Sequence, residues 1–228
     1  MRTAPSDPRE TPRYSLSQAA QYLSLSPTTL RSWVVGRHYP VTSGLRYSPP
    51  LIGRPDPDDP RLSFSNLVEA HVLRALRTRH QVPMSAVRTA LDYAETELRI
   101  QRLLLSDELR TTAGTVFLNH LGQLVDLGRS GQLAMQRLLE GHLLRIDRDI
   151  AGAPHRLFPV TSQGIGGPKI VVIDPSVSFG RPFISGKGVR TSTIVERLDA
   201  GEPREAVAQD YGLVPSEIDE AILYERAA

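Results

Sequence analysis

The sequence predicts a mainly α-helical protein with small β elements, and three observations lead to this fold class. Apolar residues recur three and four positions apart over several stretches of the 228 residues, which is the spacing of the buried face of a helix. Serine or proline stands at the start of these stretches and glycine at several of their ends, where helices are capped. Alternating patterns that favour β-strands are short and few. We expect two or three modules, since a chain of this length can bury one large core or two small ones.

Composition disfavours several classes of protein. Hydrophobic residues make up 40% and charged residues 23% of the chain, which is typical of a globular protein. No apolar run approaches the roughly 20 residues that span a bilayer, and residues 1–12, which we expect to be disordered, lack the apolar stretch of a secretion signal. The chain has no cysteine, and its six histidines never stand three or four positions apart, as a helical metal pair would. We therefore expect a cytoplasmic protein with no membrane contact, cofactor or metal.

The two ends of the chain carry opposite charge. Residues 1–50 contain six arginines and two acids, whereas residues 195–228 contain three arginines and nine acids. A basic surface favours phosphate groups, and an acidic surface favours a basic partner. The charge pattern thus predicts a nucleic-acid face near the start of the chain and a protein-binding face near its end.

Residues 14–36 contain two short helix patterns in succession. Ser15 and Gln18 have the spacing of a capping box at the start of the first, and Ser26 followed by Pro27 starts the second. This is the spacing of a helix-turn-helix, although an ordinary helical hairpin that only fills a core would show the same pattern. The apolar residues expected to face the core are Leu16, Ala19, Ala20, Leu23, Leu30, Trp33 and Val34.

The second helix is the candidate DNA reader. In a helix-turn-helix this helix enters the major groove by its N-terminal end, where hydroxyl and arginine side chains reach base edges and phosphates. Residues 37–53 combine aromatic and basic residues with turn formers around Ser43 and Gly44, which predicts a short two-stranded wing beside it. The expected DNA-binding residues are Ser26, Thr28, Thr29, Arg31 and Ser32 on the helix and Arg37, Arg46 and Tyr47 on the wing.

Two longer helices are expected after the proline-rich linker at residues 54–60. Apolar residues at helical intervals predict one over residues 64–80, and Pro83 starts another that runs to about residue 105. A first domain would thus cover residues 13–105.

A connecting region is expected over residues 106–160. Residues 115–128 contain two apolar stretches on either side of Asn119 to Gly122, which favours a β-hairpin. A helix over residues 132–146 follows. Its apolar face and that of residues 64–80 are the expected contacts of a homodimer.

The last module, residues 165–228, begins after a glycine-rich stretch. A strand is expected over residues 170–173, and a glycine-punctuated segment leads into three short helices around a small core. The helices are expected to begin at Thr191 or Ser192, at Pro203 and at Pro215.

Two other functions of this module are disfavoured. A phosphate loop would need GxxxxGK[ST], but Gly180 stands one position too far from Gly186, and Gly188 replaces the hydroxyl residue. A second DNA-reading unit is disfavoured because the expected outer face is acidic and would repel phosphates. The acids on that face are Glu202, Glu205, Asp210, Glu217, Asp219 and Glu220.

The first part of the chain resembles a known family of DNA-binding proteins. The stretch YSLSQAAQYLSLSPTTLRSW, a wing, and LSFSNLVEAHVLRALRTRHQVPMSAVRTAL follow in the order found in the MerR-type winged helix-turn-helix family. The resemblance covers residues 14 to about 95 and implies sequence-specific binding to a palindromic site, usually as a dimer. The long dimerising coiled coil and effector domain of that family are missing.

The last part resembles another family, the VapB-type antitoxins, which are encoded beside toxins with a PIN-like nuclease fold. The stretch from residue 170 to 225 carries the G-x-P-x-I-x-G run at Gly180, Pro182, Ile184 and Gly186. Further matches are Thr191, Ile194, Gly201, Ala208, Tyr211, Leu213, Ile218 and Ala221. The chain departs from the family pattern at two positions, Ser185 in place of the usual arginine and Val214 in place of a capping Thr or Ser.

Together these features predict a DNA-binding antitoxin that acts without catalysis. The resemblance implies a partner, a cognate PIN-like ribonuclease toxin that the chain neutralises, and repression of its own operon as a homodimer on operator DNA. The acidic residues 202, 205, 210, 217, 219 and 220 are the expected toxin-binding surface, because a ribonuclease must present a basic surface to RNA. The alternative is a stand-alone transcription regulator without a toxin partner.

Overall fold

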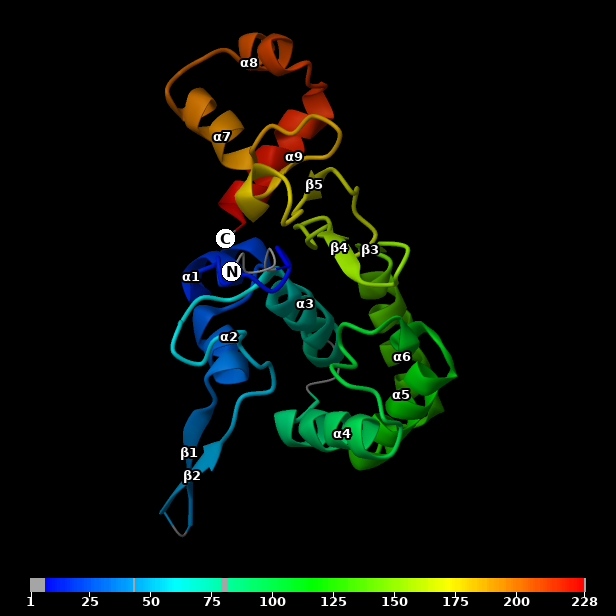
Figure 1. Ribbon diagram of the computed structural model, residues 1–228. Helices are drawn as coiled ribbons and strands as arrows, with labels where there is room; N and C mark the ends of the chain where they lie inside the picture. Colours follow the sequence, from blue (N-terminus) through cyan, green and yellow to red (C-terminus); the bar gives the residue numbers. More distant parts are fainter. Residues whose placement is uncertain (1–6, 43, 79–81, 228) are drawn as a thin grey trace, which may run out of the picture.

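The structure, a computed structural model, describes residues 7–42, 44–78 and 82–227. Figure 1 shows mainly helices with small antiparallel strand pairs, so the predicted fold class is confirmed. Ser43, expected in the turn of the wing, and residues 79–81 at the end of an expected helix lie outside the described residues. Within the described part of the chain, no helix is long and apolar enough to cross a membrane, and no group of histidines and acids could hold a metal ion.

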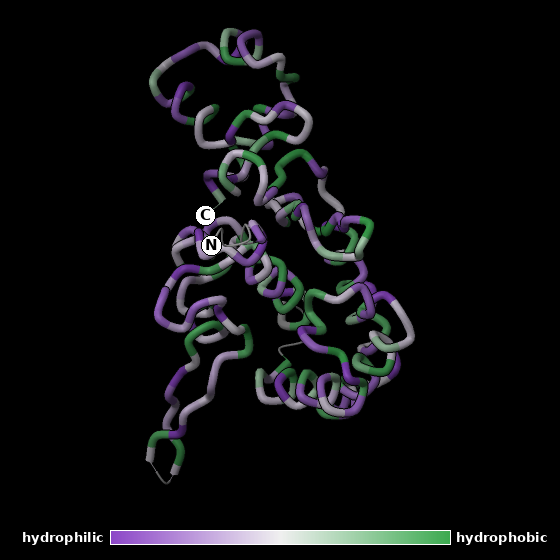
Figure 2. The backbone as a smooth tube through the Cα atoms, viewed as in Figure 1, coloured by the Kyte–Doolittle hydropathy of each residue, from purple (hydrophilic) through white to green (hydrophobic). Residues whose placement is uncertain are grey.

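The chain begins with the predicted helix-turn-helix and wing. Its elements are α1 (Leu16–Tyr22), α2 (Pro27–Val34), β1 (Arg37–Val41) and β2 (Gly44–Ser48). The strands pair with Arg37 opposite Ser48 and Val41 opposite Gly44. The wing extends away from the rest of the molecule, and Figure 2 shows hydrophobic residues next to its turn. One of them, Leu45, is 75% exposed.

A long central helix organises the main core. It is α3 (Phe64–Thr78), and its side chains at Leu67, Val68, Val72 and Leu76 are fully buried within the chain. They pack with residues of α1, α2 and the helices that follow, α4 (Met84–Thr96), α5 (Thr112–Leu124) and α6 (Arg129–Leu143). Because α3 is covered on its apolar side by its own chain, the prediction that it forms a dimer contact is wrong.

The β-hairpin expected at residues 115–128 is also wrong, because this segment is helical. The side chain of Thr111 caps α5 by accepting a hydrogen bond from the backbone N–H of Ala113. Phe117 and Leu121, one helical turn apart, are both fully buried. Gly122, which suggested a turn, instead allows α6 to approach, since a Cβ at this position would lie 2.8 Å from Nε2 of Gln132.

The helix expected from Pro83 to about residue 105 ends at Thr96. The chain then turns through Arg99 and Arg102, which have positive φ angles of 58° and 47°. This turn lets the chain fold back so that Leu103 and Leu104 are buried in the main core. The short helix η1 (Asp107–Arg110) leads into α5.

The last module has its own core and a two-stranded sheet. The strands are β5 (Val171–Val172) and β6 (Phe183–Ile184), so the expected strand is shorter than residues 170–173. Ile194, Val207 and Ile218 are fully buried with neighbours from the three predicted helices. These helices are α7 (Thr191–Asp199), α8 (Arg204–Tyr211) and α9 (Pro215–Arg226), and the short helix η2 (Ser178–Gly180) precedes β6.

A second small sheet joins the main core to this module. It consists of β3 (Ile146–Arg148) and β4 (Pro154–Leu157), and Leu157 exchanges backbone hydrogen bonds with Ile173. The buried core therefore runs across residue 105 and reaches Ile173. The domain limits predicted at residues 12, 105 and 160 stay predictions.

Part of the segment expected to be disordered has defined contacts. Residues 1–6 of that segment lie outside the described residues, but Arg9 pairs with Asp7 at 2.8 Å and with Asp149 at 2.7 Å. Glu10 accepts a hydrogen bond from the hydroxyl of Ser65 on α3. Arg9 and Glu10 are therefore held against other parts of the chain.

Candidate nucleic-acid interface and C-terminal acidic surface

The two helices of the helix-turn-helix form as the sequence predicts. The side chain of Ser15 accepts a hydrogen bond from the backbone N–H of Gln18, and the Gln18 side chain accepts one from the backbone N–H of Ser15, so the capping box is complete. Leu30, Trp33 and Val34 are buried beneath α2, as expected. The Arg74 guanidinium on α3 donates a hydrogen bond of 2.6 Å to the carbonyl oxygen of Leu23, which ties the turn between α1 and α2 to the main core.

The exposed side of α2 carries the five predicted DNA-binding residues of this helix. Ser26, Thr28 and Arg31 are exposed, and Thr29 and Ser32 are half-buried. The hydroxyls of Ser26 and Thr28 lie 2.7 Å apart at the N-terminal end, while the Ser32 hydroxyl donates to the carbonyl oxygen of Thr29. Ser26 and Thr28 use one hydroxyl hydrogen between them. The other hydroxyl hydrogen is therefore free to donate at the N-terminal end of α2, where a recognition helix meets base edges.

One face of the wing completes a groove with α2. The rings of His38 and Tyr47 lie 4.9 Å apart on this face, and the Tyr47 hydroxyl donates a hydrogen bond to the carbonyl oxygen of Val35. The groove has a volume of about 610 Å³ and brings together Thr28, Thr29, Arg31, Ser32, Arg37 and Tyr47. Of the residues predicted to bind DNA, these six line one concave surface.

Arg46 does not join this groove. It stands opposite Tyr39 in the strand register, on the face away from Tyr47, because neighbouring residues of a strand point to opposite sides. It lines a second groove of about 740 Å³ between the wing and the start of α4. Ser32, Arg37 and Tyr47 line this second groove as well as the first, so the two grooves share part of the predicted set, and Ser26 lines neither of them.

The base of the wing is fixed to α2 and α4. Gly36 has a φ of 85°, and a Cβ there would lie 2.5 Å from the carbonyl oxygen of Ser48. The backbone N–H groups of Leu51 and Ile52 both donate to the carbonyl oxygen of Trp33. The Arg88 guanidinium on α4 donates to the carbonyl oxygen of Pro50, so the angle between wing and helix is set at several points.

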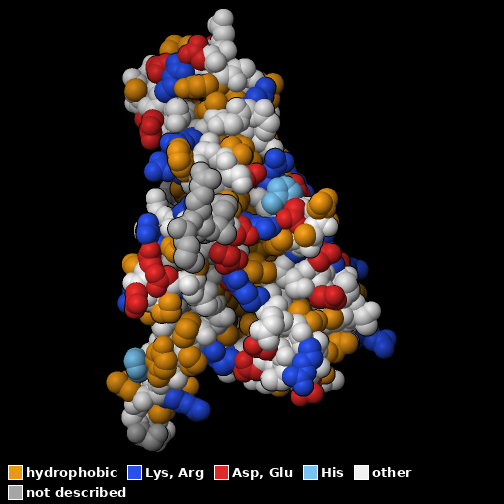
Figure 3. All heavy atoms as spheres, viewed as in Figure 1, with side chains coloured by type: hydrophobic (Ala, Val, Ile, Leu, Met, Phe, Trp, Pro, Cys, Tyr) orange, Lys and Arg blue, Asp and Glu red, His pale blue; other side chains and the backbone are white. Residues whose placement is uncertain are grey.

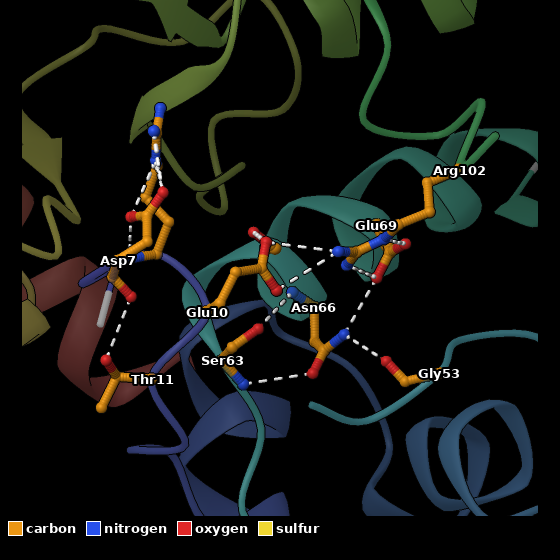
Figure 4. Close-up of polar contacts among 10 residues, drawn as sticks. Asp7, Glu10, Thr11, Gly53, Ser63, Asn66, Glu69 and Arg102 are labelled. Atoms are coloured by element: carbon orange, nitrogen blue, oxygen red, sulfur yellow. Dashed lines mark hydrogen bonds and ion pairs between the residues drawn. The ribbon is translucent and has the colours of Figure 1, made fainter. Parts of the chain in front are cut away.

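A buried polar network below the helix-turn-helix was not predicted. Figure 4 shows Asn66 of α3 between Gly53, Ser63 and Glu69. Its side-chain amide donates to the carbonyl oxygen of Gly53 and to Glu69, and Arg102 forms an ion pair with Glu69 at 3.0 Å. The network joins the segment after the wing, α3 and the turn after α4. The spacing of Ser63 and Asn66, which cap each other at the start of α3, is the sequence signal that could have revealed it.

The predicted acidic surface is largely occupied by internal contacts. Arg197 on α7 binds both Glu202 and Asp210, with 2.6 Å to the latter, and Arg204 pairs with Asp219. On the face seen in Figure 3, acidic and basic side chains are interspersed over this module. Neutralised pairs attract a basic partner less than a continuous acidic surface would.

The remaining three acids have different environments. Glu217 accepts a hydrogen bond from the backbone N–H of Val214 and so caps α9. Glu220 is 1% exposed, and its carboxylate accepts a hydrogen bond of 2.6 Å from Gln163, so its predicted place on the outer face is wrong. The periodicity of α9 did not reveal this, because the chain that covers Glu220 comes from the glycine-rich segment before the module. Glu205 is exposed, and no partner contacts it within the described residues.

The C-terminal module is docked onto the helix-turn-helix. The buried hydroxyl of Tyr224 on α9 donates to the carbonyl oxygen of Tyr22 on α1, and burial raises the pKa of this hydroxyl. Gly180 lies against Tyr14, where a Cβ would collide with the tyrosine oxygen. Arg13 donates to the carbonyl oxygen of Pro175. These contacts place the end of the chain beside α1 (Figure 1).

Arg145 fixes the segment between the main core and the module. It is 2% exposed, and desolvation lowers the pKa of its guanidinium. Its five hydrogen bonds go to the carbonyl oxygens of Phe158, Pro159, Ile165, Gly167 and Pro168. Three of these carbonyl groups belong to the glycine-rich segment that the sequence suggested as a module boundary. Arg145 therefore binds this segment to the main core.

Comparison with known proteins matches both ends of the chain to families. Residues 12–91 match a family described as "Putative DNA-binding HTH domain", and residues 171–224 match one described as "Protein of unknown function (DUF433)".

Two proteins of Mycobacterium tuberculosis are similar over nearly the whole chain. The protein named "Putative antitoxin VapB45" is 31% identical, and the alignment covers 93% of each chain. "Uncharacterized protein Rv2308" is 25% identical over 92% of this chain and 89% of its own. The crystal structure of Rv2018 from the same organism superimposes with a TM-score of 0.68 and 26% identity, covering 93% of this chain and 98% of that one.

Proposed function

The chain belongs to the family of the VapB45 antitoxin and carries a DNA-binding helix-turn-helix domain, and from this premise we propose that it neutralises a PIN-like ribonuclease toxin and represses its own operon as a dimer. The observation that carries the proposal is the direct docking of the C-terminal module on the helix-turn-helix through Tyr224 and Tyr22. One chain thereby holds a DNA-reading surface and a protein-binding module in a fixed relation.

The DNA-reading role is supported by the groove between α2 and the wing. Arginine can bind a guanine edge or a phosphate with two parallel hydrogen bonds, and threonine hydroxyls can reach bases or phosphates. Thr28, Thr29, Arg31 and Arg37 supply these groups at the end of α2 that a recognition helix inserts. Ser26, Ser32 and Tyr47 would contribute at the edges of the same contact, and Arg46 would reach phosphates from the far face of the wing.

Dimerisation is supported by the chemistry of operator binding and by exposed apolar residues. A single helix-turn-helix makes few base contacts, and dimers gain affinity from two half-sites about one helical turn apart. Leu133 on α6 is 47% exposed and Leu144 just after it is 64% exposed. We place the dimer contact on the exposed side of α6 around these two residues, because the apolar face of this helix that the sequence suggested, with Met135, Leu139 and Leu143, is buried within the chain.

Toxin neutralisation would act by covering the toxin's RNA-binding surface. Such inhibition requires no catalysis by the antitoxin. The exposed acids of the predicted surface, Glu205 foremost because it has no internal partner, remain candidate contacts.

Co-expression with the product of the neighbouring gene tests the proposal. We expect the two proteins to purify together and the complex to lack the ribonuclease activity of the free toxin. A DNA fragment from upstream of the operon should bind the purified chain in an electrophoretic mobility-shift assay. Operator binding without any complex with the neighbouring product would favour the stand-alone regulator instead.

A further inference from the structure

The loop from β5 to α7 presents the most exposed aromatic side chain of the C-terminal module. Phe179 is 81% exposed. The stretch from Pro175 to Val195 contains three cations, Arg181, Lys187 and Arg190, and no acid. This loop therefore differs in both charge and polarity from the acidic helices that follow it.

The backbone holds Phe179 outward in an unfavourable conformation. Ser178 and Phe179 both have left-handed φ angles, 49° and 56°, which residues other than glycine rarely adopt. Gly180 follows with a φ of 73° and sits against the buried Tyr14, while the Ser178 hydroxyl donates to the carbonyl oxygen of Gly188. The surrounding structure thus forces an apolar ring into solvent. Strained residues that persist in this way often mark binding sites.

The arginines beside Phe179 are available to a partner. Arg181 is exposed and Arg190 is half-buried, and neither guanidinium has a hydrogen bond or ion pair with another described residue. Both arginines influence the Tyr22 hydroxyl. Burial raises the pKa of this hydroxyl, and the positive charge of each arginine opposes that rise. By contrast, Arg197, Arg204 and Arg226 in the helices of this module all hold carboxylates.

We infer that Phe179, flanked by Arg181 and Arg190, is the anchor by which this chain binds its toxin. The inference rests on the proposed function and adds an anchoring contact, separate from the acids such as Glu205 that would face the basic RNA-binding surface of the toxin. The complementary surface on the toxin is an apolar pocket bordered by carboxylates. The aromatic ring fills the pocket, and the two guanidinium groups pair with the acids around it.

The chemistry of the loop favours a protein over a nucleic acid. Aromatic residues and arginine are the residue types most enriched among the residues that dominate protein–protein binding energy. A phenylalanine ring cannot donate a hydrogen bond to phosphate, and it contributes to duplex binding mainly where it is wedged between base steps. Moreover, the groove at α2 and the wing already supplies the DNA-facing arginines.

Two pairs of matched variants test the inference in the full-length chain. Phe179→Ala removes the ring, and its control Ile150→Ala removes a fully exposed apolar side chain at the β3–β4 turn. Arg181→Glu reverses a charge on the loop, and its control Arg99→Glu does so at the exposed turn after α4. Each variant is titrated with the purified product of the neighbouring gene and, separately, with operator DNA. Circular dichroism and thermal unfolding verify that each variant is folded.

We expect both loop variants to weaken binding of the neighbouring gene product by about tenfold or more, as for the central residues of other interfaces. The controls should stay within about twofold of wild type, and operator affinity should be unchanged. Loop variants that bind the product as tightly as wild type overturn the inference but leave the proposed function intact. A drop in operator affinity alone overturns it as well and assigns the loop to DNA. If the wild-type chain itself fails to bind the product, the proposed function fails and this inference fails with it.

Discussion

The hydroxyl of Tyr224, on the last helix, donates a buried hydrogen bond of 3.0 Å to the carbonyl oxygen of Tyr22, on the first helix. This contact joins two residues 202 positions apart in the chain. It belongs to a cluster in which the rings of Tyr14 and Tyr22 meet edge to face at 6.1 Å. Any change in the C-terminal module that moves α9 therefore acts directly on the helix that supports the recognition helix.

Replacing this hydroxyl measures how strongly the two parts are joined. Tyr224→Phe should lower the free energy of unfolding by about 1 to 3 kcal/mol, because it leaves a buried carbonyl oxygen without a partner. Tyr39→Phe is the control, since no described residue bonds to the Tyr39 hydroxyl. Urea unfolding followed by circular dichroism compares the two variants. Equal stabilities would mean that water replaces the Tyr224 hydroxyl at this contact.

The arginines of the α2 groove should control operator affinity. Arg31→Ala combined with Arg37→Ala should leave the chain folded, because both side chains are exposed. Operator binding should weaken by a few kcal/mol, and its salt dependence should flatten by about 0.9 in slope for each phosphate that the variant no longer binds. Fluorescence anisotropy at several salt concentrations measures both. An unchanged affinity would show that the hairpin serves only the core.

Trp33 provides the contrasting case on the same helix. It is 1% exposed beneath α2. Trp33→Ala should cost about 3 to 5 kcal/mol of stability, because it empties a buried aromatic site. A melting temperature equal to that of wild type would contradict the packing described for this helix.

Two buried histidines should make the chain sensitive to acid. Burial lowers the pKa of His142 to about 4 and holds the pKa of His71 well below its usual value, and their rings lie 4.9 Å apart. The unfolded chain takes up protons on both residues below about pH 6.5, whereas the folded chain resists protonation. Stability is therefore retained above that pH. It should fall, by about 1.4 kcal/mol per pH unit for each histidine still neutral, as the pH drops toward 4. Denaturant unfolding at pH 7 and pH 5 tests this, and His142→Gln should reduce the pH dependence.

The surface of α6 should determine the oligomeric state. Leu133→Glu introduces a charge on the proposed dimer contact and should yield a monomer with weakened operator binding. Leu223→Glu on α9, where the side chain is 41% exposed, is the control and should leave the mass unchanged. Light scattering at micromolar concentration measures the mass. A wild-type chain that is monomeric and still binds its operator tightly would refute the dimer.

Local sequence determined the helix-turn-helix, the wing and the helices of the C-terminal module. The capping box at Ser15, the helix start at Pro27 and the buried position of Trp33 were all predicted and are all confirmed. Each depends on residues within one or two helical turns, so the relevant interactions can be read from spacing alone. The grouping of Thr28, Thr29 and Arg31 on one exposed surface follows from the same helical period.

Tertiary structure decided the roles of residues whose contacts come from distant parts of the chain. Gly122 looked like a turn former, but its lack of a side chain serves the close approach of Gln132 on α6. Glu220 has the spacing of a surface acid and is buried because Gln163 covers it. The same acidic residues can form a surface that attracts a basic partner, or they can be neutralised by ion pairs within the chain. The positions of Arg197 and Arg204 decide between these two arrangements. Charge counts and hydrophobic periodicity depend on residues that are close in the sequence. Burial of a side chain and formation of an ion pair depend on residues that are close in space.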